Sequence, residues 1–420
     1  MTTRPCHDLS PGQIDGCQIC GAKDLQPIMS LGHHAPCDSL LWPEQLHRAE
    51  RTYPLDLIRC PDCGLVQIDH VVAPEELFFP EYPYRSGITS TLVGNLRSTG
   101  PTIMQRYGIG GGLAIDIGSN DGTLLSGFRD AGMQVLGVEP TNIARIANEN
   151  GIDTIQEFFS EDLARDIVTK RGPAKVVTAA NMFAHVAKLG SLIRGVELLL
   201  ERSGVFVTES HYLTDLLETV QYDSIYHEHL KYYSVKSIVR LFDYYDFTVV
   251  DVDRIPNYGG SIRVYAMKGK GHPVGDSVTR LIAEETRLGL YGNETYDRFV
   301  AQVRQSKIAL QKLLVDARAE GRSVAGIGSP GRAATLLSYC NIDRDLLPYI
   351  AEQSTSLKLG LFMPGSHVPI VDEARLFAEQ PDYAVMLSWH YWEPIVAKLR
   401  AKGLKSHIVL PLPAVHVLEP

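Results

Sequence analysis

The chain has 420 residues, a length that predicts two or three domains in series, each with a core of its own. Its hydrophobic content of 45% and charged content of 21% are those of ordinary soluble proteins and argue against fibrous and disordered classes, while the net charge of -9 argues against nucleic acid as a partner. The sequence has no leader-like start and no apolar run of about 18 residues, so we expect a cytoplasmic chain with no membrane partner.

The first predicted domain, residues 1-78, is rich in Cys, Pro and His, and its predicted strands, near 55–58 and 64–68, are short. Six of the seven cysteines fall within the first 63 residues. In a chain with no secretory signal, this clustering indicates metal ligation ahead of disulfides.

Two C-x-x-C pairs, Cys17 with Cys20 and Cys60 with Cys63, have the spacing of zinc knuckles. Four thiolates leave no open coordination position, so the predicted Zn²⁺ is structural and supplies folding energy to a region with little core. The alternative is two unrelated pairs of buried or redox cysteines. Three cysteines lie outside the pattern and are expected to be plain thiols: Cys6, Cys37 and Cys340.

The second predicted domain, residues 79-270, alternates strand-like apolar runs with amphipathic helical stretches. Right-handed crossovers between such strands build a doubly wound, Rossmann-like parallel sheet. The expected strands are 113–117, 135–138, 175–178 and 204–208.

A glycine-rich turn follows the first of these strands, in the sequence Asp116-Ile-Gly-Ser-Asn-Asp-Gly122. Glycines at a strand-to-helix turn let the backbone approach a ligand at the carboxyl edge of the sheet. Glu139 ends the next strand, where an acid can accept hydrogen bonds from two ribose hydroxyls. This order resembles the class I S-adenosylmethionine-dependent methyltransferases.

That resemblance implies that the turn cradles the methionine part of S-adenosylmethionine, that the acid holds the ribose, and that residues after the third strand flank the adenine. Phe158 and Phe159 are candidates to cover the adenine ring, and the alternative is that both are core aromatics. The expected cofactor-binding residues are Asp116, Gly118, Ser119, Asn120, Gly122, Glu139, Pro140, Phe158 and Asn181.

The densest group of reactive side chains is the segment around Tyr226, His227, Glu228 and His229. The two imidazoles of a His-Glu-His sequence converge poorly on one metal ion, so general acid-base chemistry fits better. A histidine can take a proton, a carboxylate can orient it, and a tyrosine hydroxyl can donate to a developing oxyanion. The alternative is a buried polar cluster with a structural role.

The third predicted domain, residues 271-420, begins with a helical pattern over 276–320 and continues as another α/β series. Its expected strands lie at 323–327, 349–350, 383–387 and 407–410. A turn from Gly326 to Gly331 matches G-x-G-x-x-G and is followed by Glu352, which taken literally indicates an NAD site.

Taken together, the four-cysteine module, the first glycine-rich turn, the string YHEHLKYYS (226–234) and the string NYGGSIR (257–263) resemble the nucleotide-sugar C-methyltransferases of deoxysugar (tetronitrose) biosynthesis. The resemblance covers nearly the whole chain. It implies three domains: a zinc-binding module, a central S-adenosylmethionine domain and a C-terminal Rossmann-like domain that helps bind the sugar nucleotide. The substrate it implies is a nucleotide-diphosphate 4-keto-6-deoxy sugar, whose C3 proton is removed so that the enolate attacks the methyl group.

Carried over position by position, the resemblance makes His229 the general base and Tyr226 a group that stabilises the enolate or relays a proton. Glu228 and His185 belong to the same site, and one base suffices, so His227 is expected to be structural. Two tyrosines match a loop of the family that lies near the sugar, and the sequence does not choose between them: Tyr82 and Tyr84.

For the second glycine-rich turn the resemblance implies a backbone cradle for the diphosphate in place of an NAD site, with the 389–391 loop nearby. Arg332 stands where the family usually has Lys, Glu352 where it has Asp, and His390 where it has Asn, so the nucleotide base stays open. The expected substrate-binding residues are Asn257, Arg263, Ser329, Arg332, Lys358 and His367.

Two rival interpretations remain at this point. The same base could serve 3'-epimerisation or sugar ring contraction without methyl transfer, and a zinc-module protein could use its α/β domains for binding only. We expect a monomer or weak homodimer.

Overall fold

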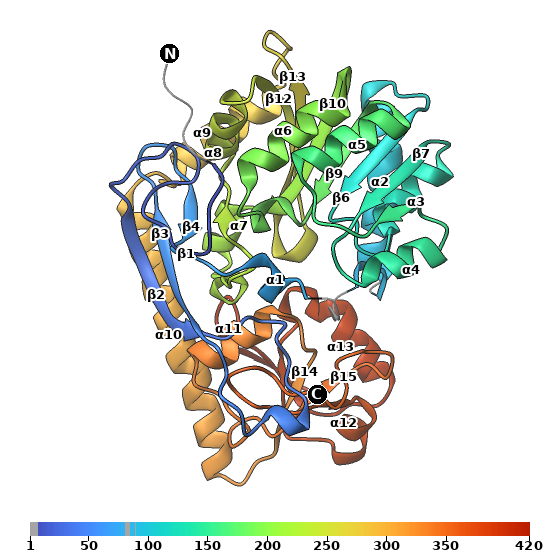
Figure 1. Cartoon of the computed structure of the whole chain (residues 1–420). Coiled ribbons are helices and arrows are strands. Elements are labelled where there is room, and N and C mark those ends of the chain that lie inside the picture. Colours follow the sequence, from blue (N-terminus) through green and yellow to red (C-terminus); the bar gives the residue numbers. More distant parts are fainter. Residues whose placement is uncertain (1–6, 80–84, 89) are drawn as a thin grey trace.

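The computed structural model describes residues 7–79, 85–88 and 90–420. They form three regions that follow one another along the sequence, as the colours of Figure 1 show. The expected α/β class with three domains is confirmed. No helix in these residues combines the length and the apolar character needed to cross a bilayer.

The N-terminal region is built on short strands, and its main sheet is completed by a strand from the central region. Its elements are β1 (Gly12–Gln13), β2 (Gln26–His34), β3 (Tyr53–Arg59), β4 (Val66–Ile68), β5 (His70–Val71) and α1 (Pro74–Leu77). The sheet order is β11-β4-β3-β2, where β11 (Lys231–Tyr232) follows directly on the His-Glu-His segment. The two strands predicted here are confirmed as β3 and β4.

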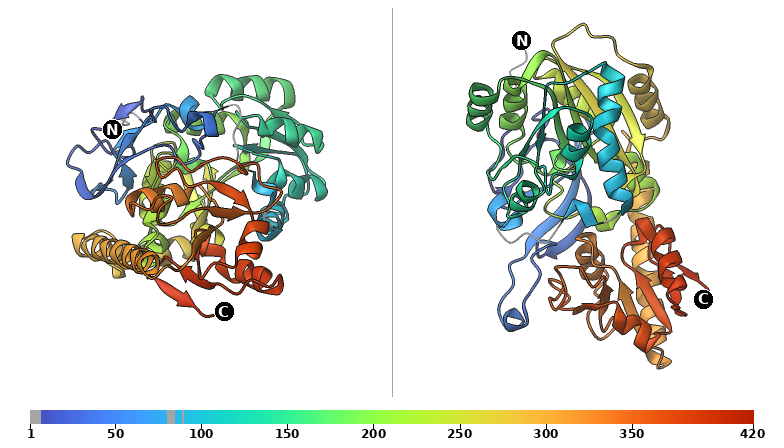
Figure 2. Two further views of the ribbon diagram at one scale, coloured as in Figure 1. Left: turned by 90° about the horizontal axis from the view of Figure 1, so that it is seen from below. Right: turned by 90° about the vertical axis from the view of Figure 1, so that its right-hand side faces the viewer.

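A seven-stranded sheet forms the central region, with helices on both faces (Figure 2). In spatial order its strands are β12 (Phe247–Ile255), β13 (Ser261–Lys268), β10 (Leu200–His211), β9 (Ala174–Ala180), β6 (Leu113–Ile117), β7 (Gln134–Val138) and β8 (Thr154–Ile155). Alternate residues of β6 pack on opposite faces, Ile115 and Ile117 on one and Ala114 on the other, which explains why the strand is apolar apart from the buried Asp116.

The five strands β6 to β10 run parallel, and all of them except β8 were predicted, whereas β13 runs antiparallel to both β10 and β12. This antiparallel edge pair was not among the predicted strands. The helices of the region are α2 (Ser90–Tyr107), α3 (Thr123–Asp130), α4 (Ile143–Glu149), α5 (Glu161–Arg171), α6 (Leu189–Leu199), α7 (Leu213–Glu218) and α8 (Val235–Asp243).

The C-terminal region carries a six-stranded sheet that is parallel except for its last strand. In order its strands are β16 (Ile370–Asp372), β15 (Ile350–Glu352), β14 (Val324–Ile327), β17 (Tyr383–Met386), β18 (His407–Leu410) and β19 (His416–Leu418). Its helices are α11 (Arg332–Tyr339), α12 (Ala374–Glu379) and α13 (Trp392–Ala401). All four predicted strands of this region are present.

The predicted helical stretch before this sheet is two helices, α9 (Asp276–Arg287) and α10 (Asn293–Ala319). They are separated at Gly289, whose φ of 72° is left-handed and ends the first helix. α9 packs on β12, and α10 runs along β2 into the C-terminal region, so the N-terminal and C-terminal regions lie side by side (Figure 1).

Candidate active site and zinc site

The carboxyl ends of β6, β7, β9 and β10 meet at one edge of the central sheet. Ligands of open α/β sheets bind at this edge. The glycine-rich turn, Glu139, Asn181 and His211 all stand there, each at or just after the end of its strand.

The first glycine-rich turn exposes its backbone to this edge. Gly118 and Gly122 have φ of 71° and 78°, and a Cβ atom at Gly118 would lie 2.8 Å from the Met182 side chain. Ser119 Oγ and Asn181 Oδ1 are buried without a hydrogen-bond partner within the described residues. Unpaired buried oxygens beside a bare backbone fit a polar ligand such as S-adenosylmethionine.

Glu139 is buried, and backbone groups orient its carboxylate. Its Oε2 accepts from the backbone N–H of Asn120 at 3.0 Å, and its Oε1 accepts from the N–H of Thr141 at 3.0 Å and from its hydroxyl at 2.7 Å. These bonds leave carboxylate lone pairs for ribose hydroxyls. Pro140 lies half-buried beside this carboxylate.

Asp116 lies beneath the turn and is 3% exposed. It accepts from the Thr178 hydroxyl at 2.6 Å. Burial raises the pKa of Asp116 to about 7, and the charges of Glu139 and Glu209 act in the same direction. Asp116 is therefore partly protonated near neutral pH, and the hydrogen bond from Thr178 favours its charged form.

The two candidate adenine-covering aromatics differ in exposure. Phe158 is 42% exposed, whereas Phe159 packs against the core so closely that a Cβ atom at Gly195 would lie 2.7 Å from its ring. Phe159 is thus a core aromatic, and Phe158 stays the candidate for the adenine.

His229 lies in the loop between the short helix η4 (Tyr222–Ser224) and β11, at the centre of an aromatic cluster. Its Nδ1 donates to the carbonyl oxygen of Ser224 at 2.8 Å, so its Nε2 carries a free lone pair. The ring centroid of Tyr226 is 4.0 Å away, that of His185 4.8 Å and that of His211 4.9 Å. We call these four side chains the histidine cluster.

Burial is the main cause of the shifted pKa values in the cluster. It lowers the pKa of His229 well below 6.5, helped by His185 and His211, and lowers the pKa of His185 to about 3. It also raises the pKa of Tyr226 well above 10. At neutral pH the imidazoles are therefore uncharged and the phenol keeps its proton, the states required of a base and of a hydrogen-bond donor.

His227 and Glu228 point to other partners. His227 Nε2 donates to the carbonyl oxygen of Pro54 in β3 at 3.1 Å. Glu228 Oε1 accepts from the thiol of Cys37 at 3.4 Å, and both side chains are buried. Cys37 was predicted to be a plain thiol, and its contact with Glu228, 191 residues away along the chain, was missed.

The C-terminal region reaches the cluster through Arg332, the first residue of α11. Its guanidinium is 5% exposed, and its Nε lies 3.8 Å from Asp223 Oδ2, which also accepts from Trp389 Nε1 at 2.7 Å. Arg332 Nη1 has no hydrogen-bond partner within the described residues. It adds to the lowered pKa of His211 and His229, which places it close to both imidazoles.

Glu209, in β10, was not singled out from the sequence. It accepts from Asn257 Nδ2 at 2.8 Å and from Arg263 Nη2 at 2.9 Å, and it is 2% exposed. A buried acid at the carboxyl end of a central strand was the available signal. Asn257 and Arg263, two of the six expected substrate-binding residues, are thus held by Glu209.

The remaining expected substrate residues have partners within the chain. Ser329 donates to Glu352 through both its N–H and its hydroxyl. Lys358 Nζ donates to Asp38 Oδ1 at 3.0 Å, and His367 pairs with the carboxylate of Glu50.

The second glycine-rich turn is approached by the N-terminal region. A Cβ atom at Gly331 would lie 3.2 Å from Cys37 Sγ and 3.4 Å from Asp38 Oδ2. The carboxylate beside this turn is that of Asp38, whose negative charge is paired with Lys358 at 3.0 Å. Three residues named from the sequence lie outside the described residues: Cys6, Tyr82 and Tyr84.

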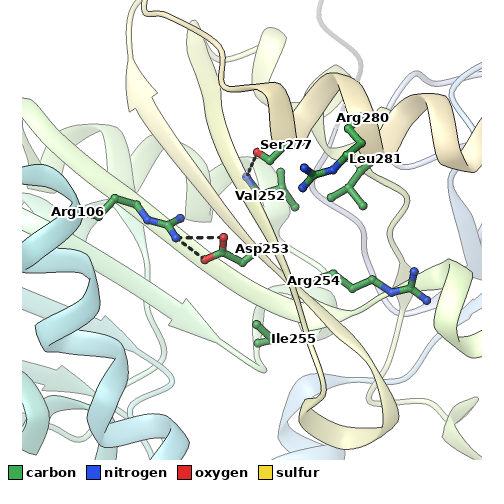
Figure 3. A pocket seen from close by; sticks show the side chains of 8 residues that line it. All are labelled: Arg106, Val252, Asp253, Arg254, Ile255, Ser277, Arg280 and Leu281. Carbon is green, nitrogen blue, oxygen red and sulfur yellow. Dashed lines mark hydrogen bonds and ion pairs between the residues drawn. The ribbon is translucent and has the colours of Figure 1, made fainter.

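A surface pocket of about 520 Å³ lies elsewhere, between the outer edge strand β12 and α9 (Figure 3). Two of its arginines are already paired, Arg106 with Asp253 at 2.9 Å and Arg254 with Asp215 at 2.6 Å. It shares no residue with the histidine cluster. Its lining residues are Arg106, Val252, Asp253, Arg254, Ile255, Ser277, Arg280 and Leu281.

The four cysteines of the C-x-x-C pairs come together in the N-terminal region. Their Sγ atoms all lie within 4.8 Å of one another, with Cys17 to Cys63 at 3.4 Å and Cys20 to Cys60 at 3.4 Å. A tetrahedral Zn²⁺ with Zn–S bonds of about 2.3 Å separates its sulfurs by about 3.8 Å. The four thiolates therefore fit a structural zinc ion. Within the described residues two groups of side chains could hold a metal ion, these four cysteines and the set Cys37, Asp38 and Glu228. Neither group includes a histidine.

Family models match three successive parts of the chain. They are described as a zinc binding domain over residues 17–78, a methyltransferase domain over 107–252 and a C-methyltransferase C-terminal domain over 256–413.

The chain is also similar to a curated relative and, over less than half of its length, to solved structures. The C-methyltransferase NovU of Streptomyces niveus is 33% identical over 386 residues, 91% of each chain. A methyltransferase structure from Anabaena variabilis is 16% identical, with a TM-score of 0.34 over 42% of this chain and 86% of that one. The magnesium protoporphyrin IX methyltransferase of Synechocystis is 14% identical, with a TM-score of 0.32 over 43% and 82%. From the family models and NovU, the chain belongs to the S-adenosylmethionine-dependent C-methyltransferases that carry an N-terminal zinc-binding domain and a C-terminal domain of their own.

Proposed function

We propose that the chain methylates C3 of a nucleotide-diphosphate 4-keto-6-deoxy sugar by way of an enolate. The observation that carries this proposal is His229, whose Nδ1 is fixed on the Ser224 carbonyl while its neutral Nε2 lies free beside the Tyr226 ring. A carbonyl at C4 makes the C3 proton acidic enough for an imidazole to remove. The motif resemblance of the whole chain to sugar C-methyltransferases supports the choice of substrate.

In the proposed reaction, His229 Nε2 takes the C3 proton, and the C–H electron pair forms a C3–C4 double bond as the carbonyl electrons move to oxygen. Tyr226 donates to that oxygen. S-adenosylmethionine, when bound, would supply an electrophilic methyl group: C3 forms the new C–C bond as the carbonyl re-forms, and the S–CH3 bond breaks with its electron pair left on the sulfur of S-adenosylhomocysteine. Arg332 and Lys358 are proposed to meet the diphosphate, and Glu228 and His185 to border the sugar.

The test is incubation with 4-keto sugar nucleotides in deuterated water, with and without S-adenosylmethionine. We expect exchange of one sugar proton without the donor, and the mass gain of one methyl group with it. Exchange with no methyl gain under any condition would favour epimerisation or ring contraction. The absence of both exchange and methylation would contradict the enzyme proposal. Full function of a His229→Ala, Tyr226→Phe double variant would support a binding protein.

Glu139→Ala is expected to weaken S-adenosylmethionine binding by about 10- to 100-fold. Hydrogen bonds to a charged group contribute about 1.5 to 3 kcal/mol, and 1.4 kcal/mol corresponds to a tenfold change in Kd. Titration calorimetry measures the effect. Glu149→Ala, which removes an exposed carboxylate from α4, is the control and is expected to leave the Kd unchanged. An unchanged Kd in Glu139→Ala would remove Glu139 from the cofactor site.

The activity is expected to persist as the pH falls through 6.5. Protonation removes the lone pair of His229, and the pKa of His229 lies well below 6.5, so kcat/KM falls only at lower pH. The measurement is kcat/KM between about pH 5 and pH 8, with circular dichroism as the check on folding. A half-maximal value at or above pH 6.5 would contradict a neutral, buried base.

A further inference from the structure

His211 is a half-buried imidazole to which the proposed reaction gives no role. It is the last residue of β10, and its backbone is fixed by pairing with Ser261 of β13. Its ring centroid lies 4.9 Å from that of His229 and 6.0 Å from that of Tyr258. No feature of the sequence around it pointed to this position, because the neighbours of His211 come from distant parts of the chain.

His211 and His185 flank His229 at nearly equal ring distances, 4.9 Å and 4.8 Å. They come from the ends of the adjacent parallel strands β9 and β10, which are tied together where the Asn181 N–H donates to the Glu209 carbonyl oxygen at 2.9 Å. Both lie at the edge of the sheet where the methyl donor binds.

Neither ring nitrogen of His211 has a hydrogen-bond partner in the part of the chain that the structure describes. The side chain is half-buried, so it keeps access to the space beside His229. The ring nitrogens of His211 are therefore open to a hydrogen bond with a ligand that enters this space. The ligand atoms of the three imidazoles do not converge within 4.8 Å, so they form no metal site of the kind that the four cysteines make.

His211 is held neutral by its surroundings. Burial lowers its pKa to about 3, and the positive charge of Arg332 acts in the same direction. A neutral imidazole always carries one N–H, so His211 can donate a hydrogen bond without supplying a proton.

We propose that His211 donates a hydrogen bond to the substrate oxygen on which negative charge develops when His229 removes the neighbouring proton. This inference rests on the proposed function. His211 would act with Tyr226 as a second donor to the enolate oxygen, and it keeps its own proton throughout. The abstracted proton stays on His229, and the electron pair of the broken C–H bond passes to the enolate.

The test compares His211→Ala with His211→Asn and His211→Gln, whose amide groups can replace an N–H at Nδ1 or Nε2. Loss of one such donor costs about 10²- to 10³-fold in kcat. We expect His211→Ala to lose that factor both in kcat and in the rate of solvent deuterium exchange, with the S-adenosylmethionine Kd unchanged. One of the two amide variants is expected to recover at least about tenfold. His272→Ala, which removes an imidazole bonded to the Lys268 carbonyl at the far end of β13, is the control.

Three results would overturn the inference. The first is a His211→Ala enzyme with wild-type kcat and exchange. The second is a loss of S-adenosylmethionine affinity and thermal stability shared equally by all three variants, which would make His211 structural. The third is a wild-type enzyme that neither exchanges nor methylates any 4-keto sugar nucleotide, and only this result also defeats the proposed function.

Discussion

Replacement of His229 by Asn is expected to lower kcat by about 10²- to 10⁴-fold, the contribution of a positioned general base. The Asn amide can still donate to the Ser224 carbonyl as Nδ1 of His229 does at 2.8 Å, so the loop keeps its anchor. The variant lacks any group in place of Nε2, and the substrate proton then has no acceptor. The loss should therefore be chemical and not conformational.

Two measurements distinguish a loss of the chemical step from a change in conformation. Solvent deuterium exchange into the sugar should fall with kcat, because both need the same proton abstraction, whereas the S-adenosylmethionine Kd should stay within about threefold of the wild type, a difference below about 0.7 kcal/mol. His272→Ala again serves as the histidine control, since within the described residues its ring bonds only to the Lys268 carbonyl. A His229→Asn enzyme that exchanges the sugar proton at the wild-type rate would assign the base to another group, with His185 and His211 the nearest candidates.

Most of the parallel strands were predictable because they are buried on both faces and their sequences are therefore mainly apolar. β6 and β18 begin and end at the predicted residues. The glycines after β6 indicate the turn. The edge strands β12 and β13 were missed. β12 has one half-exposed face and alternates charged with apolar residues. Such a pattern is difficult to distinguish, from sequence alone, from that of an irregular surface segment.

The zinc ligands were predictable because spacing along the chain fixes the geometry of a knuckle. The residue directly after the second cysteine of each pair is a glycine with left-handed φ, Gly21 at 76° and Gly64 at 75°. Its N–H donates back to the carbonyl oxygen of the first cysteine. Local sequence decides this structure entirely.

The rest of the site depends on contacts between distant segments. Cys37 meets Glu228, Glu209 holds Asn257 and Arg263, and His211 meets His229, and no periodic pattern in one segment encodes any of these pairs. Asn257 and Arg263 illustrate the consequence. Their side chains were assigned to the substrate from sequence, and the structure gives each a carboxylate partner within the chain.

One of these distant contacts joins the zinc region to the catalytic loop. β11 begins two residues after His229 and pairs with β4, with Lys231 opposite Gln67 and the Ile68 N–H donating to the Leu230 carbonyl at 3.1 Å. Gln18, between two zinc ligands, accepts from Lys231 Nζ at 2.8 Å. A zinc ion on the four cysteines would therefore hold the scaffold on which the proposed catalytic loop rests.

Loss of zinc is accordingly expected to disable catalysis while leaving the methyl donor bound. The Cys60→Ser variant should contain less than the one zinc ion per chain expected for the wild type, as metal analysis by mass spectrometry would measure. Structural zinc contributes of the order of 10 kcal/mol to the folding of small domains, so residues 7–79 should become sensitive to limited proteolysis. A misplacement of about 1 Å in a catalytic group costs about 100-fold, and we expect kcat to fall by at least that factor.

The Kd for S-adenosylmethionine separates a detached loop from a general loss of structure. Its expected ligands lie on β6 and in the segments that follow β6, β7, β8 and β9, and these four strands pair within the central sheet and not with the zinc region. The Kd should therefore change little in Cys60→Ser. Cys340→Ser is the matched control, because it removes a buried thiol that contacts the Tyr222 hydroxyl at 3.2 Å and touches no zinc ligand. Zinc-free protein with wild-type kcat would show that β11 holds His229 in place without the ion, and an equal loss of S-adenosylmethionine binding would show that the zinc region stabilises the whole chain.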